Sequence, residues 1–288
     1  MTRRRYLEDP IGELAFDAGK MAFVSGPRQV GKTTLARAFI RRQGGVYANW
    51  DDIGTRRSWA KDPKMLVPES GQAKQVLVLD EIHKAKSWKR SLKGIYDTLE
   101  QPLDILVTGS ARLNVYRKGS DSLLGRYLHF RLHPFSVREL GWGTPMRPDE
   151  VLDALAARGI RGRASAAEAL TGLLRYGGFP EPYLGQDDRR ARLWRRGRVE
   201  KVIREDLRDL SRIPELSRVE MLAALLPERV GSTLSVASLR EDLEVAHDTV
   251  SRWLGYLREL YYVFEIKPYH RSVRRSLRKE GKLYLWDW

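Results

Sequence analysis

The sequence contains no cysteine and only five histidines. Without cysteine, a disulfide scaffold and a thiolate metal site are both excluded. The histidines are scattered; His129 and His133 could share a strand face, but they fit ordinary core or surface residues better than metal ligands. No apolar run approaches the ~20 residues that a membrane span needs. The basic start, Met1 to Tyr6, lacks the apolar stretch of a signal peptide. We therefore expect a cytoplasmic protein with no membrane partner.

Positively charged residues outnumber negatively charged ones. Lys and Arg number 52 against 37 Asp and Glu, which gives a formal net charge of +15. Two stretches, 189–208 and 267–282, hold nine and seven of these basic residues. Such clustering favours a polyanionic partner, DNA above all. An arginine-rich genome would raise the charge without any such partner, so the charge supports this interpretation and does not prove it.

A short glycine-bracketed segment carries the clearest chemical signal. Two glycines five positions apart are followed by Lys and Thr, a pattern typical of a phosphate-binding loop; the segment comprises Gly26, Pro27, Arg28, Gln29, Val30, Gly31, Lys32, Thr33 and Thr34. A strand-like run, 21–24, precedes the lysine-bearing loop, and a helix-like run, 34–40, follows it. Loop N–H groups and the helix N-terminus then form an anion site. We expect Lys32 to reach the outer phosphates of ATP and Thr33 to hold Mg²⁺.

A second group of residues supplies carboxylates. The apolar run from Gln75 ends in Asp80 and Glu81 and suits a central parallel strand. Asp80 would then emerge beside the phosphate loop and hold Mg²⁺. Glu81 could polarise water for attack on the γ-phosphate, which favours ATP hydrolysis. The alternative is that both acids merely begin a helix.

A third strand is expected over 103–108, with Ser110 just beyond its end. The Ser110 hydroxyl could orient the attacking water or contact the γ-phosphate. It could equally cap a helix, and both roles can hold together.

These motifs, with three further ones, resemble a family. The chain is similar to prokaryotic AAA-type ATPases that join a P-loop module, related to signal-transduction ATPases, to a C-terminal region of uncharacterised function. The resemblance rests on the ordered segments 26–34, 79–83, 108–112, 123–126, 134–139 and 177–181, which together span most of the chain.

The resemblance implies a parallel sheet of about five strands with helices on both faces, followed by a helical lid. It implies that Arg126 acts on the γ-phosphate bound by a neighbouring subunit, with Arg112 as the second candidate for this role. The alternative is that Arg126 is solvated or forms a salt bridge and has no role at the γ-phosphate. Pro180 would lie near the nucleotide base, although Gly177 and Gly178 could simply end a helix.

Four regions are expected: an ATPase core over 1–145, a lid over 146–185, a linker helix over 186–215 and a winged helix-turn-helix over 216–288. Within them we predict a leading helix over 9–20, a strand over 46–50 and a helix capped by Ser87. In the lid we predict a helix over 150–158 and a second one opened by a capping box at Ser165.

The winged helix-turn-helix is predicted from helices over 235–243 and from Asp248, then strands over 262–266 and 283–286. The residues expected to contact DNA lie on the second helix and on a basic loop; they are Thr249, Ser251, Arg252, Arg271, Arg274, Arg275 and Arg278. Protein contact through the same module is the alternative.

The sequence thus predicts a Mg²⁺-dependent ATPase that acts as a DNA-associated motor or remodeller in a ring. An ATP-driven switch that controls a protein partner is the alternative, and Glu81 disfavours a metabolite kinase. Relatives continue past the last predicted strand into a region that resembles a nuclease fold. The sequence ends at Trp288, and we assign no nuclease activity to it.

Overall fold

The computed structural model describes residues 3–69, 71, 73–110, 113, 123–141, 164–207 and 215–286. The chain divides into two compact units, Met1–His133 and Pro134–Trp288. The division falls before the expected boundary at residue 145. Residues 137–141 form helix α6 (Val137–Gly141), which packs against helix α8 (Ala164–Tyr176) of the second unit.

The first unit is built on a five-stranded parallel sheet with the strand order β2-β3-β4-β1-β5. The strands are β1 (Met21–Ser25), β2 (Gly45–Asn49), β3 (Gln75–Asp80), β4 (Leu103–Gly109) and β5 (Tyr127–Arg131). Because all five run in the same direction, the ends of β1, β3 and β4 lie together at the carboxyl edge. That edge carries the predicted site residues that follow these strands.

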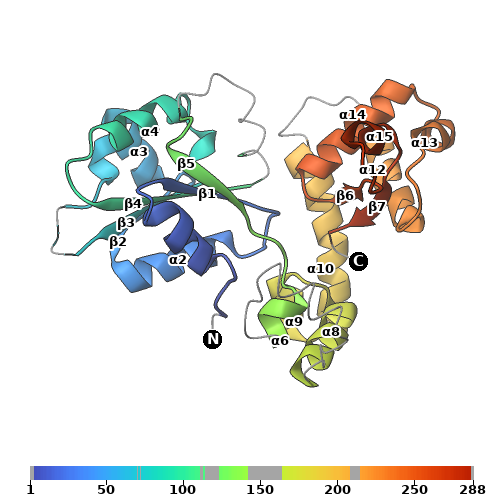
Figure 1. The fold of residues 1–288 in the computed structure, drawn as a ribbon, viewed down its shortest axis with the longest axis horizontal. Helices are drawn as coiled ribbons and strands as arrows, with labels where there is room; N and C mark the ends of the chain where they lie inside the picture. The colour runs from blue at the N-terminus through green and yellow to red at the C-terminus, as the bar shows by residue number, and fades with distance from the viewer. Residues whose placement is uncertain are drawn as a thin grey trace. The chain divides into compact units, whose positions relative to one another are not determined.

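Helices cover both faces of this sheet (Figure 1). Helices α3 (Ile53–Lys61) and α4 (Trp88–Asp97) share one core with alternate strand residues, among them Phe23, Leu77 and Val107. On the other face lie η1 (Ile11–Phe16) and α2 (Lys32–Gln43), joined by an edge-to-face contact of Phe16 with Phe39 at 5.5 Å. Short turns of helix complete the unit: α1 (Glu8–Pro10), η2 (Pro63–Leu66) and η3 (Ile82–Lys84). This arrangement confirms the predicted P-loop α/β fold class.

One predicted cap in this unit is wrong. Helix α4 begins directly after Ser87, as predicted, but the Ser87 side chain makes no capping hydrogen bond. Its backbone lies in the left-handed region with φ 53°. A capping residue needs an extended backbone to aim its oxygen at the first N–H groups of the helix.

The second unit is mainly helical. After α6 and α8 come α9 (Pro180–Gly185), α10 (Asp188–Lys201) and η5 (Val202–Leu207). The linker helix predicted over 186–215 is thus helical over 188–207, and residues 208–214 lie outside the described part of the chain. The capping box at Ser165 is wrong, because helix α8 already includes Ser165 and its hydroxyl donates to the Gly141 carbonyl at 2.8 Å. The helix predicted over 150–158 lies outside the described residues.

The C-terminal part of this unit combines helices with a two-stranded sheet. Its elements are α12 (Leu216–Leu225), η6 (Leu226–Arg229), α13 (Val236–Leu243), α14 (His247–Glu259), β6 (Val263–Ile266), α15 (Val273–Arg278) and β7 (Lys282–Leu285). Strands β6 and β7 pair antiparallel. The expected basic loop between them is wrong over 273–278, where α15 forms and Ser276 anchors it by donating to the Pro268 carbonyl at 2.6 Å. Whether this module acts as a winged helix stays a prediction.

The described helices include none that combines the length and the apolar character needed to cross a membrane.

Candidate nucleotide-binding site

The glycine-bracketed loop lies between β1 and α2, as the sequence predicted. Gly31 sits at the start of α2 with φ 99°, a left-handed conformation that favours glycine. Gly26 is required for another reason: a Cβ there would run into the Leu132 carbonyl oxygen. No side chain caps α2, so its first N–H groups are left to serve an anion.

Lys32 is buried within this loop. Its ammonium group donates to the carbonyls of Gly26 and Pro27 at 2.9 and 2.8 Å. These two bonds hold the cation over the loop, close to where phosphate oxygens would replace the carbonyls as partners. Arg28, Gln29, Thr33 and Thr34 are exposed around it, while Val30 is buried beneath.

Asp80 lies at the end of β3 and is almost fully buried. Three hydroxyl groups from three elements donate to its carboxylate. Thr33 and Tyr47 reach Oδ2 at 2.9 and 2.6 Å, and Thr108 reaches Oδ1 at 2.5 Å. The structure therefore brings the two predicted metal ligands, Thr33 and Asp80, into direct contact.

No sequence motif predicted a role for Tyr47 and Thr108. Both lie near the carboxyl ends of strands next to β3, on β2 and β4 respectively. Register pairs Thr108 with Asp80, so the two side chains lie on the same face of the sheet. The alternation of side chains along the predicted strands was the available signal for this. Burial and the hydrogen bond to Asp80 raise the pKa of Tyr47 to about 12, so its hydroxyl stays a donor at neutral pH.

Glu81 follows Asp80 with a left-handed backbone, φ 58°, and its N–H donates to the Thr108 carbonyl at 2.8 Å. It precedes η3, yet its side chain makes no capping bond, which disfavours the role of a simple helix start. Burial raises the pKa of the Glu81 carboxyl, and the nearby Lys32 charge opposes that shift. His83 Nε2 lies 3.4 Å from its Oε2.

Ser110 follows β4 directly and is half-buried at the same edge of the sheet as Asp80 and Glu81. Its carbonyl accepts a hydrogen bond from the Leu113 N–H at 3.0 Å. Residues 111 and 112 lie outside the described part of the chain. The two proposed roles of the hydroxyl therefore both stay predictions.

Arg126 lies at the opposite, amino edge of the sheet, where it directly precedes β5. Its Nε and Nη2 donate to the Asp97 carboxylate at 2.7 and 3.1 Å. The length of β5 separates it from the phosphate loop of its own subunit, since Met21 pairs with Tyr127 and Ser25 with Arg131. The second candidate, Arg112, lies outside the described residues.

Pro180 belongs to the second unit, as the first residue of α9. Gly177 after α8 adopts φ 81°, and its N–H donates to the Leu173 carbonyl at 2.9 Å. The helix-ending role thus holds for Gly177, and contact of Pro180 with a nucleotide stays a prediction.

A cavity of about 220 Å³ borders the phosphate loop and the start of α2. Arg5, which lines it, donates to the carbonyls of Val30 and His133 at 2.6 Å each, so the N-terminal segment braces the loop. The other residues that line the cavity are Arg3, Arg4, Glu8, Thr34, Leu35, Ala38 and Arg41. The contact of this N-terminal segment with the loop was not predicted, because no local sequence pattern in the segment indicates it.

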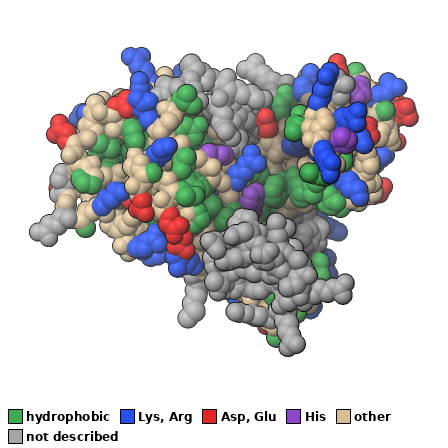
Figure 2. All heavy atoms as spheres, in the orientation of Figure 1, with side chains coloured by type: hydrophobic (Ala, Val, Ile, Leu, Met, Phe, Trp, Pro, Cys, Tyr) green, Lys and Arg blue, Asp and Glu red, His purple; other side chains and the backbone are tan. Residues whose placement is uncertain are grey.

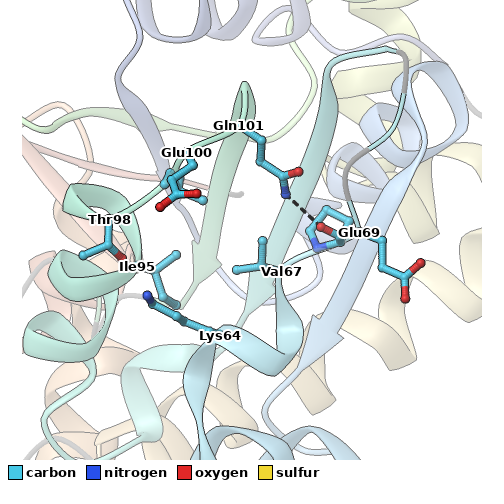
Figure 3. A pocket seen from close by; sticks show the side chains of 9 residues that line it. Lys64, Val67, Glu69, Ile95, Thr98, Glu100 and Gln101 are labelled. Atoms are coloured by element: carbon cyan, nitrogen blue, oxygen red, sulfur yellow. Dashed lines mark hydrogen bonds between the residues drawn. The ribbon is translucent and has the colours of Figure 1, made fainter.

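A larger cavity of about 640 Å³ lies away from this site (Figure 3). It is lined by residues of η2, the end of α4 and the segment before β4, where Gln101 donates to the Pro68 carbonyl at 2.8 Å. Because Gln101 precedes β4, this cavity lies at the amino edge of the sheet. It takes no part in the proposed nucleotide site.

The oxygen atoms around Asp80 fit a magnesium ion. A carboxylate and a threonine hydroxyl lie within 2.9 Å of each other at a helix N-terminus, and Mg²⁺ prefers such hard oxygen ligands together with substrate phosphates. Lys32 lies in the adjacent loop and can balance the phosphate charge.

The residues predicted to contact DNA come from α14 and from the segment that contains α15. Arg252, Arg271, Arg274 and Arg275 are exposed, and Thr249 and Ser251 are half-buried. Nothing is described of the Arg278 side chain. Lys and Arg side chains gather over this region in Figure 2. Their contact with DNA stays a prediction.

Two family models match the chain. Residues 18–141 match an AAA domain, and residues 167–288 match a domain of unknown function, DUF8612. An uncharacterised protein of Mycobacterium tuberculosis, Rv2008c, is 25% identical over 95% of this chain and 55% of its own length. An uncharacterised protein of Haemophilus influenzae is 22% identical over 100% of this chain and 72% of its own. The chain thus spans about half the length of the mycobacterial relative.

Among solved structures, Aquifex aeolicus DnaA bound to AMPPCP matches with a TM-score of 0.39 and 15% identity over 88% of this chain and 86% of that one. Aeropyrum pernix ORC1 in complex with DNA has a TM-score of 0.35 and 18% identity over 99% and 90%. The loop, the acidic strand end and the match over residues 18–141 lead to one conclusion: this part of the chain is an AAA-type P-loop domain, and a C-terminal domain of unknown function follows it over residues 167–288.

Proposed function

We propose that this protein binds ATP with Mg²⁺ and hydrolyses it. The observation that carries the proposal is the direct contact of Thr33 with Asp80, beside a loop that holds a buried lysine. Each of these groups has a distinct task around a triphosphate, and all lie at one edge of the sheet.

The residues of the chain divide the work as follows. Lys32 and the N–H groups of the loop bind and orient the outer phosphates. Thr33 and Asp80 would hold Mg²⁺, which, when bound, neutralises charge on the β- and γ-phosphates. Glu81 accepts a proton from the attacking water, and Ser110 orients that water or the γ-phosphate.

Substitution of Glu81 tests hydrolysis separately from binding. Glu81→Gln keeps the shape of the side chain but removes its basicity, so we expect ATP affinity close to that of the wild type and turnover lowered by ~10²- to 10⁴-fold. Phosphate release and binding of a fluorescent ATP analogue measure the two quantities. Wild-type turnover in this variant would remove Glu81 from the mechanism.

The position of Arg126 supports ring assembly. Since it lies at the amino edge of its own sheet, it would act on a γ-phosphate only in a neighbouring subunit. We propose that the active form is a ring in which each Arg126 completes the next subunit's site. Sedimentation with a slowly hydrolysed ATP analogue tests this assembly.

We further propose DNA as the partner of the C-terminal domain. The support is chemical: exposed arginines on α14 and around α15, in a chain with a net charge of +15. Turnover stimulated by DNA, with affinity that falls steeply as salt rises, is the expected result. If turnover ignores DNA and a stable ATP-bound state controls a protein partner instead, the alternative of a regulatory switch holds.

A further inference from the structure

Tyr47 reaches the acidic end of β3 from the neighbouring edge strand. In the sheet it pairs with Val78, and Asn49 pairs with Asp80, so Tyr47 and Asp80 project from the same face. The tyrosine side chain leans along the strand until its hydroxyl lies 2.6 Å from Asp80 Oδ2. On α2, the guanidinium group of Arg37 lies 5.3 Å from the centre of its ring and holds the ring in place.

The hydroxyl of Tyr47 shares this carboxylate oxygen with Thr33, whose Oγ1 lies 2.9 Å from it. A threonine that coordinates Mg²⁺ turns a lone pair of its oxygen toward the metal. Tyr47 then continues to hold Oδ2, while Thr108 holds Oδ1 at 2.5 Å. The orientation of the Asp80 carboxylate is thereby fixed from both sides of its own strand.

We propose that Tyr47 is a positioning residue for magnesium: from strand β2 it orients the Asp80 carboxylate and thereby sets the affinity of the site for Mg²⁺, not for the nucleotide itself. The inference rests on the proposed function, since it needs a metal at Thr33 and Asp80. Partners that orient ligating carboxylates commonly change metal affinity by ~10- to 100-fold when they are removed.

The test variant is Tyr47→Phe, which keeps the ring beside Arg37 and removes only the hydroxyl. Binding of a fluorescent ATP analogue is measured with chelator and across a magnesium titration. We expect metal-free affinity equal to that of the wild type and a half-saturating Mg²⁺ concentration raised by ~10- to 100-fold. Electron paramagnetic resonance of Mn²⁺ added with the analogue gives a second, activity-independent measure of metal binding.

The matched control is Tyr96→Phe. The Tyr96 hydroxyl donates to the Gly19 carbonyl at 2.6 Å, which precedes β1 at the amino edge of the same sheet. This variant loses a tyrosine hydroxyl from the same unit without touching Asp80, so its magnesium titration should match that of the wild type. Thermal unfolding of both variants establishes that each is folded.

Three outcomes are distinguishable. A wild-type magnesium titration in Tyr47→Phe overturns the inference, and so does an equal loss of metal-free and metal-dependent binding in that variant. If the wild-type protein binds no nucleotide under any condition, the proposed function itself fails, and the inference fails with it.

Discussion

Arg126 binds Asp97 side-on, with its Nε and Nη2 donating to the two carboxylate oxygens at 2.7 and 3.1 Å. The pair lies where β5 begins, and the hydrogen bond from Arg126 lowers the pKa of the Asp97 carboxyl. This side-on contact leaves the Nη1 edge of the guanidinium directed away from Asp97. An arginine anchored in this way can present that edge to an anion supplied by another subunit.

Arg126→Ala should therefore lower turnover by ~10³- to 10⁵-fold, the range measured for trans-acting arginines, with ATP binding retained. Mixed with Lys32→Ala subunits, it should regain part of the lost turnover, because an intact arginine then lies beside an intact loop. Lys61→Ala removes an exposed basic residue at the end of α3; it is the control and should leave turnover unchanged. Absence of rescue in the mixture would place Arg126 in the structure of its own subunit.

Lys32→Ala removes the buried ammonium group from the phosphate loop. A charge-assisted bond contributes about 1.5–3 kcal/mol, so ATP affinity should fall ~10- to 100-fold or more. Calorimetric titration measures the change. Lys64→Ala, at the amino-edge cavity, removes an exposed lysine of the same unit and should bind ATP normally. Equal affinity in the two variants would contradict the role of Lys32.

The pH profile of turnover reports on Glu81. Burial raises the pKa of its carboxyl, and a base acts only when deprotonated. Turnover should therefore fall as the pH drops through a value above the ordinary range of a glutamate. Below this pKa the carboxyl is protonated and neutral, so its burial no longer lowers the free energy of unfolding. A profile that stays flat down to the ordinary glutamate range would exclude Glu81 as the base.

Gly26→Ala tests the close packing of the loop against the chain after β5. The added methyl group would meet the Leu132 carbonyl oxygen, which is backbone and cannot swing away. We expect a loss of about 1–3 kcal/mol in the free energy of unfolding, the usual cost of overpacking. Gly94→Ala in α4 meets nothing within 4 Å and should stabilise by up to about 1 kcal/mol. Denaturant titration of both variants measures the difference, and equal stabilities would refute the close approach.

The site was predictable where its signal is local. The loop over 26–34 and the acidic pair at 80–81 each lie within one short segment, and a parallel sheet places the ends of β1 and β3 at the same edge, here with β4 between them. Tyr47, Thr108 and Arg5 escaped prediction for the opposite reason. Each acts through a hydrogen bond to a group distant in sequence. Such a bond can be recognised only when the strand register and the path of the N-terminal segment are known.

The errors in secondary structure have equally local causes. A serine before a helix suggests a cap, but the left-handed backbone of Ser87 aims its hydroxyl elsewhere. The many basic residues over 267–282 suggested a loop. The short helix α15 nevertheless forms there, and it contains Val273, Ser276 and Leu277 alongside its arginines. Charge alone does not distinguish an exposed short helix from a loop.

The central claim is that a magnesium-bound triphosphate is held between Lys32, Thr33 and Asp80. Its most direct test is calorimetric titration of the folded protein with a non-hydrolysable ATP analogue, with Mg²⁺ and with chelator. We predict saturable binding that Mg²⁺ strengthens in the wild-type protein and that Lys32→Ala weakens. Absence of saturable binding by folded wild-type protein at millimolar analogue, with and without Mg²⁺, would contradict the account.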